Sequence, residues 1–164
     1  MSYTEIYKVN KDGDCEIAGE ARNAFKGAMF IWNEFSKEYL GKDFEMFFPQ
    51  KTWGLQSDPR LSRNERIIMK TTFDNSMVRK ANIPILIEAF AEFIVTHPSD
   101  NIKTQIEIFK KLLDEDILAI CWNQTSVNNN PWTEYKEDTD EQIPYNINGG
   151  SKHWFVFDDL GEKH

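Results

Sequence analysis

Three groups of side chains in this sequence could do chemistry, and the first is the stretch WNQTSV at positions 122–127. It places an indole, two amides and two hydroxyls directly after the apolar run ILAIC. In sheets flanked by helices, the carboxyl end of a strand is a common place for a binding site. Stacking rings and hydrogen-bonding amides at such an end would suit a nucleotide-type ligand. The residues of this candidate ligand site are Trp122, Asn123, Gln124, Thr125, Tyr145 and Asn146, with Arg60, Arg63 and Arg66 as candidate phosphate partners.

The same stretch also has a structural interpretation. Residues 126–152 show little periodicity, so a long loop is expected there, and its backbone N–H and C=O groups need partners. The amides at the end of the preceding strand are the nearest donors and acceptors. We therefore expect Trp122 to be buried and Asn123 or Thr125 to bond to the backbone of the loop, which then presents the binding surface. Both interpretations stay open at this point.

The second group is a run of carboxylates inside the expected loop. Catalysis by paired carboxyls needs one of them desolvated and the other solvated on a rigid frame. A crowded acidic run in a loop is instead typical of a solvated face, which fits a basic surface on another protein. Aromatic residues beside the run would serve as anchors. The expected partner-binding residues are Trp132, Glu134, Tyr135, Glu137, Asp138, Asp140 and Glu141.

The third group consists of two cysteines and three histidines. A structural zinc site takes four ligands, usually at close spacing, and the sequence has no Cys-x-x-Cys or His-x-x-x-His pair. Cys15, Cys121 and His153 fall on or beside expected strands, so their convergence on zinc is a second alternative. Cys121 and His153 would also make a nucleophilic pair, but burial in an apolar strand raises the pKa of a thiol and silences it.

The overall charge of the 164-residue chain is −8 and is unevenly spread. Residues 114–164 hold eleven acidic side chains against three lysines, a net charge of −8, whereas residues 51–80 hold seven basic and three acidic ones, a net charge of +4. Because phosphate contacts need cations, this balance disfavours direct nucleic-acid binding and favours a basic protein partner. The sequence also has no GxxxxGK[ST], GxGxxG or GxSxG motif, so we expect no enzymatic activity, no cofactor and no metal.

The compartment follows from what the sequence lacks. No apolar run approaches the roughly 18 residues that a membrane helix needs. The segment MSYTEIYKVN has neither the basic start nor the apolar middle of a signal peptide. Two cysteines suit a reducing environment in which both remain free thiols. We therefore expect a cytoplasmic protein without membrane contact.

Hydrophobic periodicity predicts the elements that must position these groups. An Asp-Gly turn at 12–13 predicts an N-terminal hairpin, and Ile117 to Trp122 has the length and apolarity of a strand buried on both faces. Strands are expected at 3–9, 15–17, 66–73, 117–122 and 153–157. Helices are expected between Asn23 and Gly41, from 82 to 97, and from Ser99 or Asp100 to 113, with irregular chain at 42–65. The order predicts a single α+β domain over residues 1–164, with one mixed or antiparallel sheet of about five strands, three helices packed on it and a long C-terminal loop.

Five strings, in this order, carry a resemblance: YTEIYKVNKDGD, RNAFKGAMFIW, WNQTSV, IPYN and KHWFVFD. Together they resemble small uncharacterised proteins of phages and prophages of Gram-positive bacteria, over most of the chain. No activity attaches to that family, so the resemblance assigns no residue a role. It implies a mobile-element context, in which small proteins often inhibit host defences, as anti-CRISPR proteins do. The expectation is a non-enzymatic inhibitor of a CRISPR effector or another defence nuclease, acting in the host cytosol.

Overall fold

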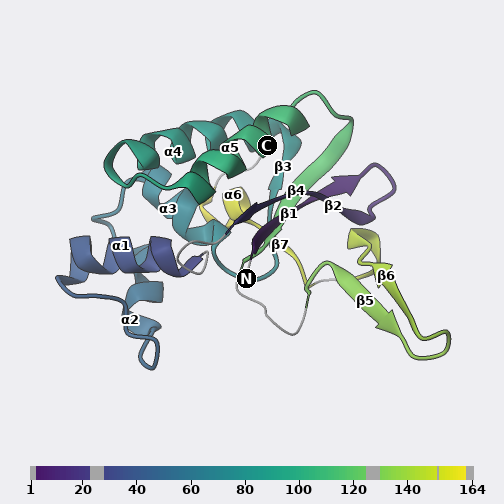
Figure 1. The fold of residues 1–164 in the computed structure, drawn as a ribbon, viewed down its shortest axis with the longest axis horizontal. Helices are drawn as coiled ribbons and strands as arrows, with labels where there is room; N and C mark the ends of the chain where they lie inside the picture. Colours follow the sequence, from purple (N-terminus) through teal and green to yellow (C-terminus); the bar gives the residue numbers. More distant parts are fainter. Residues whose placement is uncertain (1–2, 23–27, 125–129, 151, 162–164) are drawn as a thin grey trace.

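The computed structural model describes residues 3–22, 28–124, 130–150 and 152–161, which form an α+β fold around a mixed sheet (Figure 1). Within these residues the main sheet has five strands in the order β2-β1-β4-β3-β7, of which only β3 and β7 pair in parallel. Its strands are β1 (Tyr3–Asn10), β2 (Cys15–Arg22), β3 (Ser76–Arg79), β4 (Ile117–Asn123) and β7 (Trp154–Phe155). A separate antiparallel pair consists of β5 (Thr133–Lys136) and β6 (Glu141–Pro144).

Helices cover one face of the main sheet, and the β5–β6 pair extends away at the far end of the molecule (Figure 1). The α-helices in the described part of the chain are α1 (Ala28–Leu40), α2 (Gln50–Trp53), α3 (Arg63–Thr71), α4 (Ile83–Thr96), α5 (Asp100–Leu112) and α6 (Val156–Asp159). Short 3₁₀ turns follow at Gly54–Ser57, Lys80–Asn82 and Ile147–Gly149. The expected fold class and five-stranded sheet are therefore confirmed, whereas the expected number of three helices is wrong.

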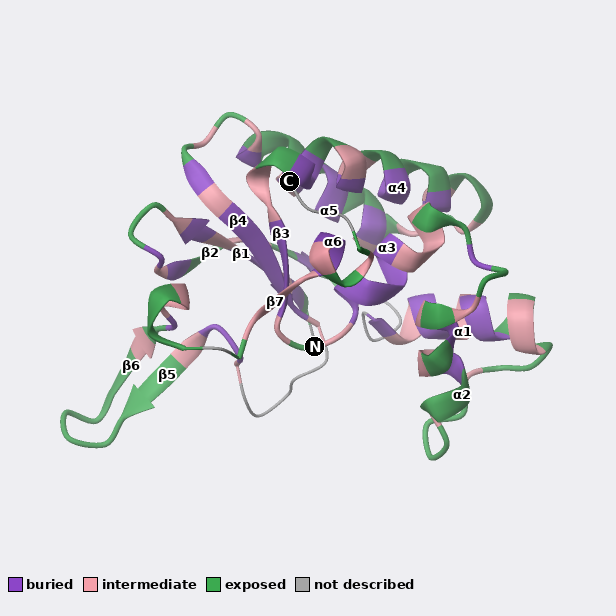
Figure 2. Ribbon diagram, turned by 180° about the vertical axis from the view of Figure 1, so that it is seen from behind, coloured by how far each residue is buried: buried purple, intermediate pink, exposed green. Residues whose placement is uncertain are grey.

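The strand β4 lies at the centre of the sheet and is buried along most of its length (Figure 2). Because side chains alternate along a strand, it contributes to two separate cores. Ile120 and Trp122 pack under the helices, and Ala119 and Cys121 pack on the opposite face. The prediction of a strand buried on both faces is confirmed.

Local signals set the ends of several elements as expected. Gly13 takes a positive φ of 93° in the turn between β1 and β2, and Gly41 takes 72° at the end of α1. The hydroxyl of Ser99 accepts a hydrogen bond from the Ile102 N–H at 3.2 Å and caps α5. Pro84 lies in the first turn of α4, where its missing N–H costs nothing. Asn23, where the first helix was expected to begin, lies outside the described residues.

The segment expected as a strand at 66–73 is instead the helix α3, so that prediction is wrong. Ser62 and Glu65 form a capping box that starts the helix three residues earlier, inside chain that was expected to be irregular. Five successive residues of α3, from Ile67 to Thr71, are buried. The alternation of apolar residues that predicted a strand here therefore does not separate a buried face from an exposed one. The neighbouring strand is β3, which begins at Ser76.

The expected long loop at 126–152 contains the β5–β6 hairpin and a 3₁₀ turn, so that prediction is also wrong. Residues 133–144 are polar and mostly exposed on both faces, which removes the alternation that reveals a strand. The expected last strand at 153–157 shrinks to the two residues of β7, and the chain continues as α6.

The capping box gives a test of α3. Replacing Ser62 with Ala removes the hydroxyl that accepts the Glu65 N–H, so we expect the free energy of unfolding to fall by about 1 kcal/mol. Urea unfolding measures this loss. The exposed Ser57, outside any α-helix, is the control, and Ser57→Ala should change stability by less than about 0.5 kcal/mol. Equal stability of Ser62→Ala and wild type would contradict the assignment.

Candidate functional site: an acidic hairpin with a fixed base

The β5–β6 hairpin is a strongly acidic projection from the molecule (Figures 1 and 2). Between positions 133 and 144 it carries five carboxylates and one lysine, a net charge of −4. All six charged side chains are exposed. The acidic residues that sequence analysis singled out are therefore brought together on one arm: Glu134, Glu137, Asp138, Asp140 and Glu141.

Side-chain hydrogen bonds order the arm itself. Asp140 takes a positive φ of 54° in the connection between the strands, where its carboxylate accepts a hydrogen bond from the Tyr135 hydroxyl. That bond raises the pKa of Tyr135, with its partial desolvation as the smaller cause. Gln142 Nε2 donates to Thr133 Oγ1 at 2.7 Å across the strand pair. The Tyr135 ring thus stays exposed, as expected of an aromatic anchor, but with a restrained hydroxyl.

Trp132 fastens the start of the hairpin to the sheet. Its side chain is 0% exposed, and its indole N–H donates to the backbone carbonyl of Trp122 at 2.7 Å. Its own carbonyl accepts the Tyr145 N–H at 2.8 Å, which closes the base of the hairpin. Trp132 is therefore a buried clasp, and its expected role as an anchor on the surface is wrong because it offers no area to a partner.

The end of the hairpin is fastened to the β1–β2 turn. Cys15 N–H donates to the Tyr145 carbonyl at 3.0 Å, and Ile147 N–H donates to the Gly13 carbonyl at 3.0 Å. Asn146 Nδ2 donates to Asp14 Oδ1 at 2.8 Å. A Cβ added to Gly13 would lie 2.6 Å from Asn148 Nδ2, so a glycine is needed for this close approach. Both ends of the hairpin are held, and its acidic part is exposed to solvent.

The described part of the stretch WNQTSV, Trp122 to Gln124, bonds to neighbouring elements of the fold. Trp122 is buried as expected, and its indole N–H donates to Gln105 Oε1 on α5 at 3.0 Å. Asn123 Nδ2 donates to Glu5 Oε1 at 2.8 Å, and Gln124 Nε2 donates to the Thr71 carbonyl at 2.7 Å. Among the described residues Asn123 bonds to Glu5 and not to the loop backbone, and the alternative, Thr125, lies outside them. The chain after β4 is nevertheless held at this strand end, because the Trp122 carbonyl accepts a hydrogen bond from the indole N–H of Trp132.

The rings of the candidate nucleotide site lie on different sides of the sheet. Trp122 packs against Phe109 in the helix-side core, with ring centroids 5.8 Å apart. Tyr145 belongs to the core on the opposite face, and the Asn146 amide bonds to the β1–β2 turn. Thr125 lies outside the described residues. Asn123 Oδ1 and Gln124 Oε1 are buried and accept no hydrogen bond from described residues.

The basic residues expected beside that site lie elsewhere. Arg60 pairs with Asp58 at 2.8 Å, before α3 begins. Arg63 lies over the Phe157 ring at 5.8 Å, and Arg66 Nε donates to the Leu61 carbonyl. Gln124 instead touches Thr71, at the other end of α3. Arg60 and Arg63 thus lie before or at the start of α3, whereas the strand end contacts its last residue.

The cysteines and histidines do not assemble a metal site in the described part of the chain. Cys15 and Cys121 are buried free thiols in the same core, and burial raises the pKa of Cys121 well above its usual value. His153 Nδ1 shares a hydrogen bond with the Tyr145 hydroxyl at 2.9 Å. Among the described residues, no group of three His, Cys, Asp or Glu side chains is placed to hold an ion. The convergence of Cys15, Cys121 and His153 on zinc is therefore not found.

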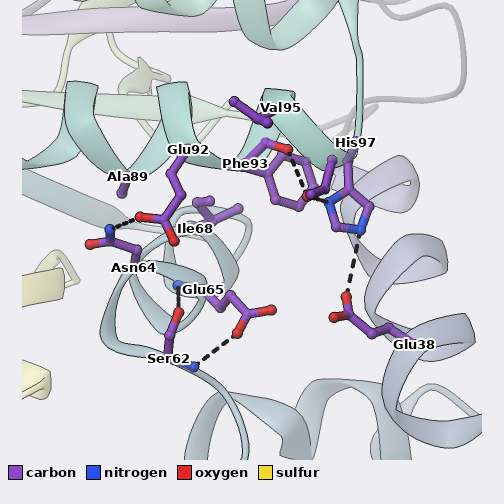
Figure 3. A pocket seen from close by; sticks show the side chains of 11 residues that line it. Glu38, Ser62, Asn64, Glu65, Ile68, Ala89, Glu92, Phe93, Val95 and His97 are labelled. Carbon is purple, nitrogen blue, oxygen red and sulfur yellow. Dashed lines mark hydrogen bonds and ion pairs between the residues drawn. The ribbon is translucent and has the colours of Figure 1, made fainter.

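A pocket that sequence analysis missed lies between α1, α3 and α4 (Figure 3). It measures about 340 Å³ and has apolar residues in its wall with three glutamates around them. Glu65 belongs to the capping box, Glu92 accepts from Asn64 Nδ2 at 2.5 Å, and Glu38 lies 3.5 Å from His97 Nε2. The pocket draws on residues from 38 to 97, and no local motif connects them.

Comparisons of the chain with protein families, curated proteins and solved structures find no match. The resemblance to phage and prophage proteins therefore remains an expectation. Among the described residues, no helix has the length and apolarity needed to cross a membrane.

Removing the Trp132 indole N–H tests the clasp. In Trp132→Phe the Trp122 carbonyl loses its partner in the core, so we expect a loss of about 1–3 kcal/mol in unfolding free energy. Amide hydrogen exchange should also rise across 133–144. The control is Trp154→Phe, which removes a more exposed indole bond to the Asp74 carbonyl and should cost less than about 1 kcal/mol. Unchanged exchange in the hairpin would show that its base is held by other contacts.

His153 makes stability depend on pH. Burial lowers its pKa in the folded protein below the ordinary value of about 6.5, so the unfolded chain binds more protons. The contribution of His153 is therefore present above about pH 6.5 and is lost as the pH falls toward its folded pKa. In His153→Gln, urea unfolding between about pH 7 and pH 5 should show a flatter decline in stability than wild type. Identical declines would contradict this assignment.

Proposed function

We propose that this protein is a non-enzymatic interaction protein whose acidic hairpin docks onto a basic, nucleic-acid-binding surface of another protein. An inhibitor of a CRISPR effector or of another host defence nuclease fits this description. The observation that carries the proposal is the net charge of −4 on an exposed arm, residues 133–144, whose two ends are fastened to the fold.

Charge and shape together favour such a partner. A nuclease channel is lined with lysine and arginine side chains that contact phosphates. Carboxylates on a narrow projection carry a negative charge, as phosphates do, and would compete with the nucleic acid for those cations. The attraction would speed association at low salt, and the restrained base would limit the conformational entropy lost on binding.

Tyr135 adds an exposed aromatic ring to the acidic hairpin. Its ring is exposed beside the acidic residues, and its hydroxyl is held by Asp140. Tyrosines with few free torsions are frequent hot spots in protein interfaces. We therefore assign the partner contact to Glu134, Tyr135, Glu137, Asp138, Asp140 and Glu141, and leave Trp132 out because it is buried.

Charge reversal on the hairpin tests the proposal against a panel of purified CRISPR effectors and other defence nucleases. In the variant Glu137→Lys, Asp138→Lys, Glu141→Lys, we expect binding to the target nuclease to weaken by at least about tenfold, and to depend less steeply on salt. Biolayer interferometry measures the affinity. Displacement of labelled DNA from the nuclease measures competition.

A matched control separates the hairpin from overall charge. The variant Glu20→Lys, Glu88→Lys, Glu107→Lys makes the same change in net charge at exposed positions on β2, α4 and α5. It should bind nearly as tightly as wild type. Equal losses in both variants would mean that overall charge acts instead of the hairpin, and no binding to any nuclease of the panel would refute the proposal.

A further inference from the structure

The end of the acidic hairpin is held at Tyr145, which contacts a histidine that the proposed role of the hairpin does not use. The Tyr145 side chain is 2% exposed, and its hydroxyl lies 2.9 Å from Nδ1 of His153. Its backbone N–H donates to the Trp132 carbonyl, and its carbonyl accepts the Cys15 N–H. Tyr145 therefore joins the hairpin, the start of β2 and the segment before β7 at one point.

The direction of the hydrogen bond between Tyr145 and His153 is set by the other partners of the hydroxyl. The backbone N–H groups of Lys152 and His153 both donate to the hydroxyl oxygen. A tyrosine hydroxyl has one proton to donate, and these two donors leave His153 Nδ1 as the acceptor of that proton. The His153 ring is therefore neutral in this arrangement, with its own proton on Nε2.

Protonation of His153 is incompatible with this bond. An imidazolium carries a proton on both nitrogens and has no acceptor to offer. Its Nδ1–H would point at an oxygen that already receives two backbone N–H groups. The hydroxyl, which belongs to a buried side chain, would also lose the acceptor of its own proton. The two side chains must therefore separate when the ring is protonated.

The surroundings of His153 favour the neutral ring. The rings of Tyr145 and Phe155 lie edge-to-face against the imidazole, with centroids 6.0 and 5.8 Å away. Burial lowers the pKa of His153 below its ordinary value. A proton taken up here would enter a partly apolar environment.

Charged and titratable groups also surround this contact. They are Lys152 over the Tyr145 ring at 4.2 Å, Asp158 and Asp159 in the depression that His153 also lines, and Glu134 and Cys15 near Tyr145. Asp158 and Asp159 already pair with Arg79 and Lys70. Their negative charges are therefore balanced by cations of the same chain.

We propose that His153 is a pH-sensitive latch on the end of the acidic hairpin. Protonation of its ring removes the acceptor of the Tyr145 hydroxyl and loosens the hold on Tyr145. The bonds from Cys15 N–H to the Tyr145 carbonyl and from Ile147 N–H to the Gly13 carbonyl then open more often. The start of the hairpin stays fastened, because the bond from its tryptophan indole to the carbonyl on β4 joins groups that do not titrate.

The latch acts on the surface to which partner binding is assigned. A hairpin held at both ends loses little conformational entropy on docking, whereas one held only at its start loses more. Mild acid therefore weakens docking without any contact between His153 and the partner. This consequence rests on the proposed function, but the latch itself is a property of the isolated protein and is tested without a partner.

Amide hydrogen exchange of the full chain, followed by NMR between about pH 7.5 and pH 5, tests the latch. The amides of Cys15, Tyr145 and Ile147 report the hold, and that of Phe109, buried in α5, is the reference for global opening. Opening releases His153 to its ordinary pKa of about 6.5, so the open state binds one more proton than the closed state. Protection is therefore full above about pH 6.5 and falls, by up to about tenfold per pH unit, toward the lower pKa of the folded protein. We expect a loss of at least about threefold at the three reporting amides and no comparable loss at the reference.

Two matched variants separate the latch from other titrations. A glutamine side chain offers an acceptor oxygen to the Tyr145 hydroxyl at every pH, so His153→Gln should abolish the loss. His97 lies 3.5 Å from Glu38 on another part of the molecule, and His97→Gln should show the same loss as wild type. Circular dichroism checks that both variants fold. In wild type alone, the loss should level off at the pH where the His153 ring resonances titrate.

Several outcomes would overturn the latch. They are constant protection at the reporting amides, an equal loss at Phe109, a loss that persists in His153→Gln, and a loss that disappears in His97→Gln. If His153→Gln does not fold, a mismatch between the ring titration and the levelling of the loss in wild type decides against it. None of these measurements depends on nuclease binding, so the latch and the proposed function fail or stand separately.

Discussion

Burial of β4 on both faces is the constraint on which the rest of the structure depends. Its alternate side chains serve two cores, one under the helices and one beneath the hairpin base. Trp122 connects the two: its indole N–H bonds to Gln105 on α5, while its carbonyl accepts the indole N–H of Trp132. Buried polar groups must be paired, so these two bonds fix a helix and the hairpin to the same strand.

This division between two faces also decides which side chains remain exposed. Side chains near the end of β4 alternate between opposite cores, and the rings of Trp122 and Tyr145 belong to different ones. Polar residues beyond the strand hold the β1–β2 turn instead. Two exposed surfaces that the sheet does not need are the acidic hairpin at one end and the apolar side chains of Met46, Phe47 and Phe48, between α1 and α2, at the other (Figure 1).

The two surfaces differ in the kind of interaction that they offer. In an association with another molecule, an exposed arm of net charge −4 would act at a distance, would be screened by salt and would contribute mainly to the rate of encounter. The exposed apolar side chains of Met46, Phe47 and Phe48 would act only on contact, and their contribution would grow with the area removed from water. Both are presented by ordered backbone, since Trp132 holds one and Trp32 the other. Preorganisation of this kind lowers the entropy cost of association without adding contacts.

The sequence by itself determined the elements whose causes are local. The Asp-Gly turn, the Ser99 cap, Gly41 and the apolar run of β4 each act within a few residues, and the corresponding elements formed as expected. Only the tertiary structure decided the rest. Trp132 is buried where its indole N–H meets the carbonyl of Trp122, α3 begins at a local capping box but is buried by its neighbours, and the pocket gathers residues from three helices. Such contacts depend on distant partners, and no short-range pattern in the chain records them.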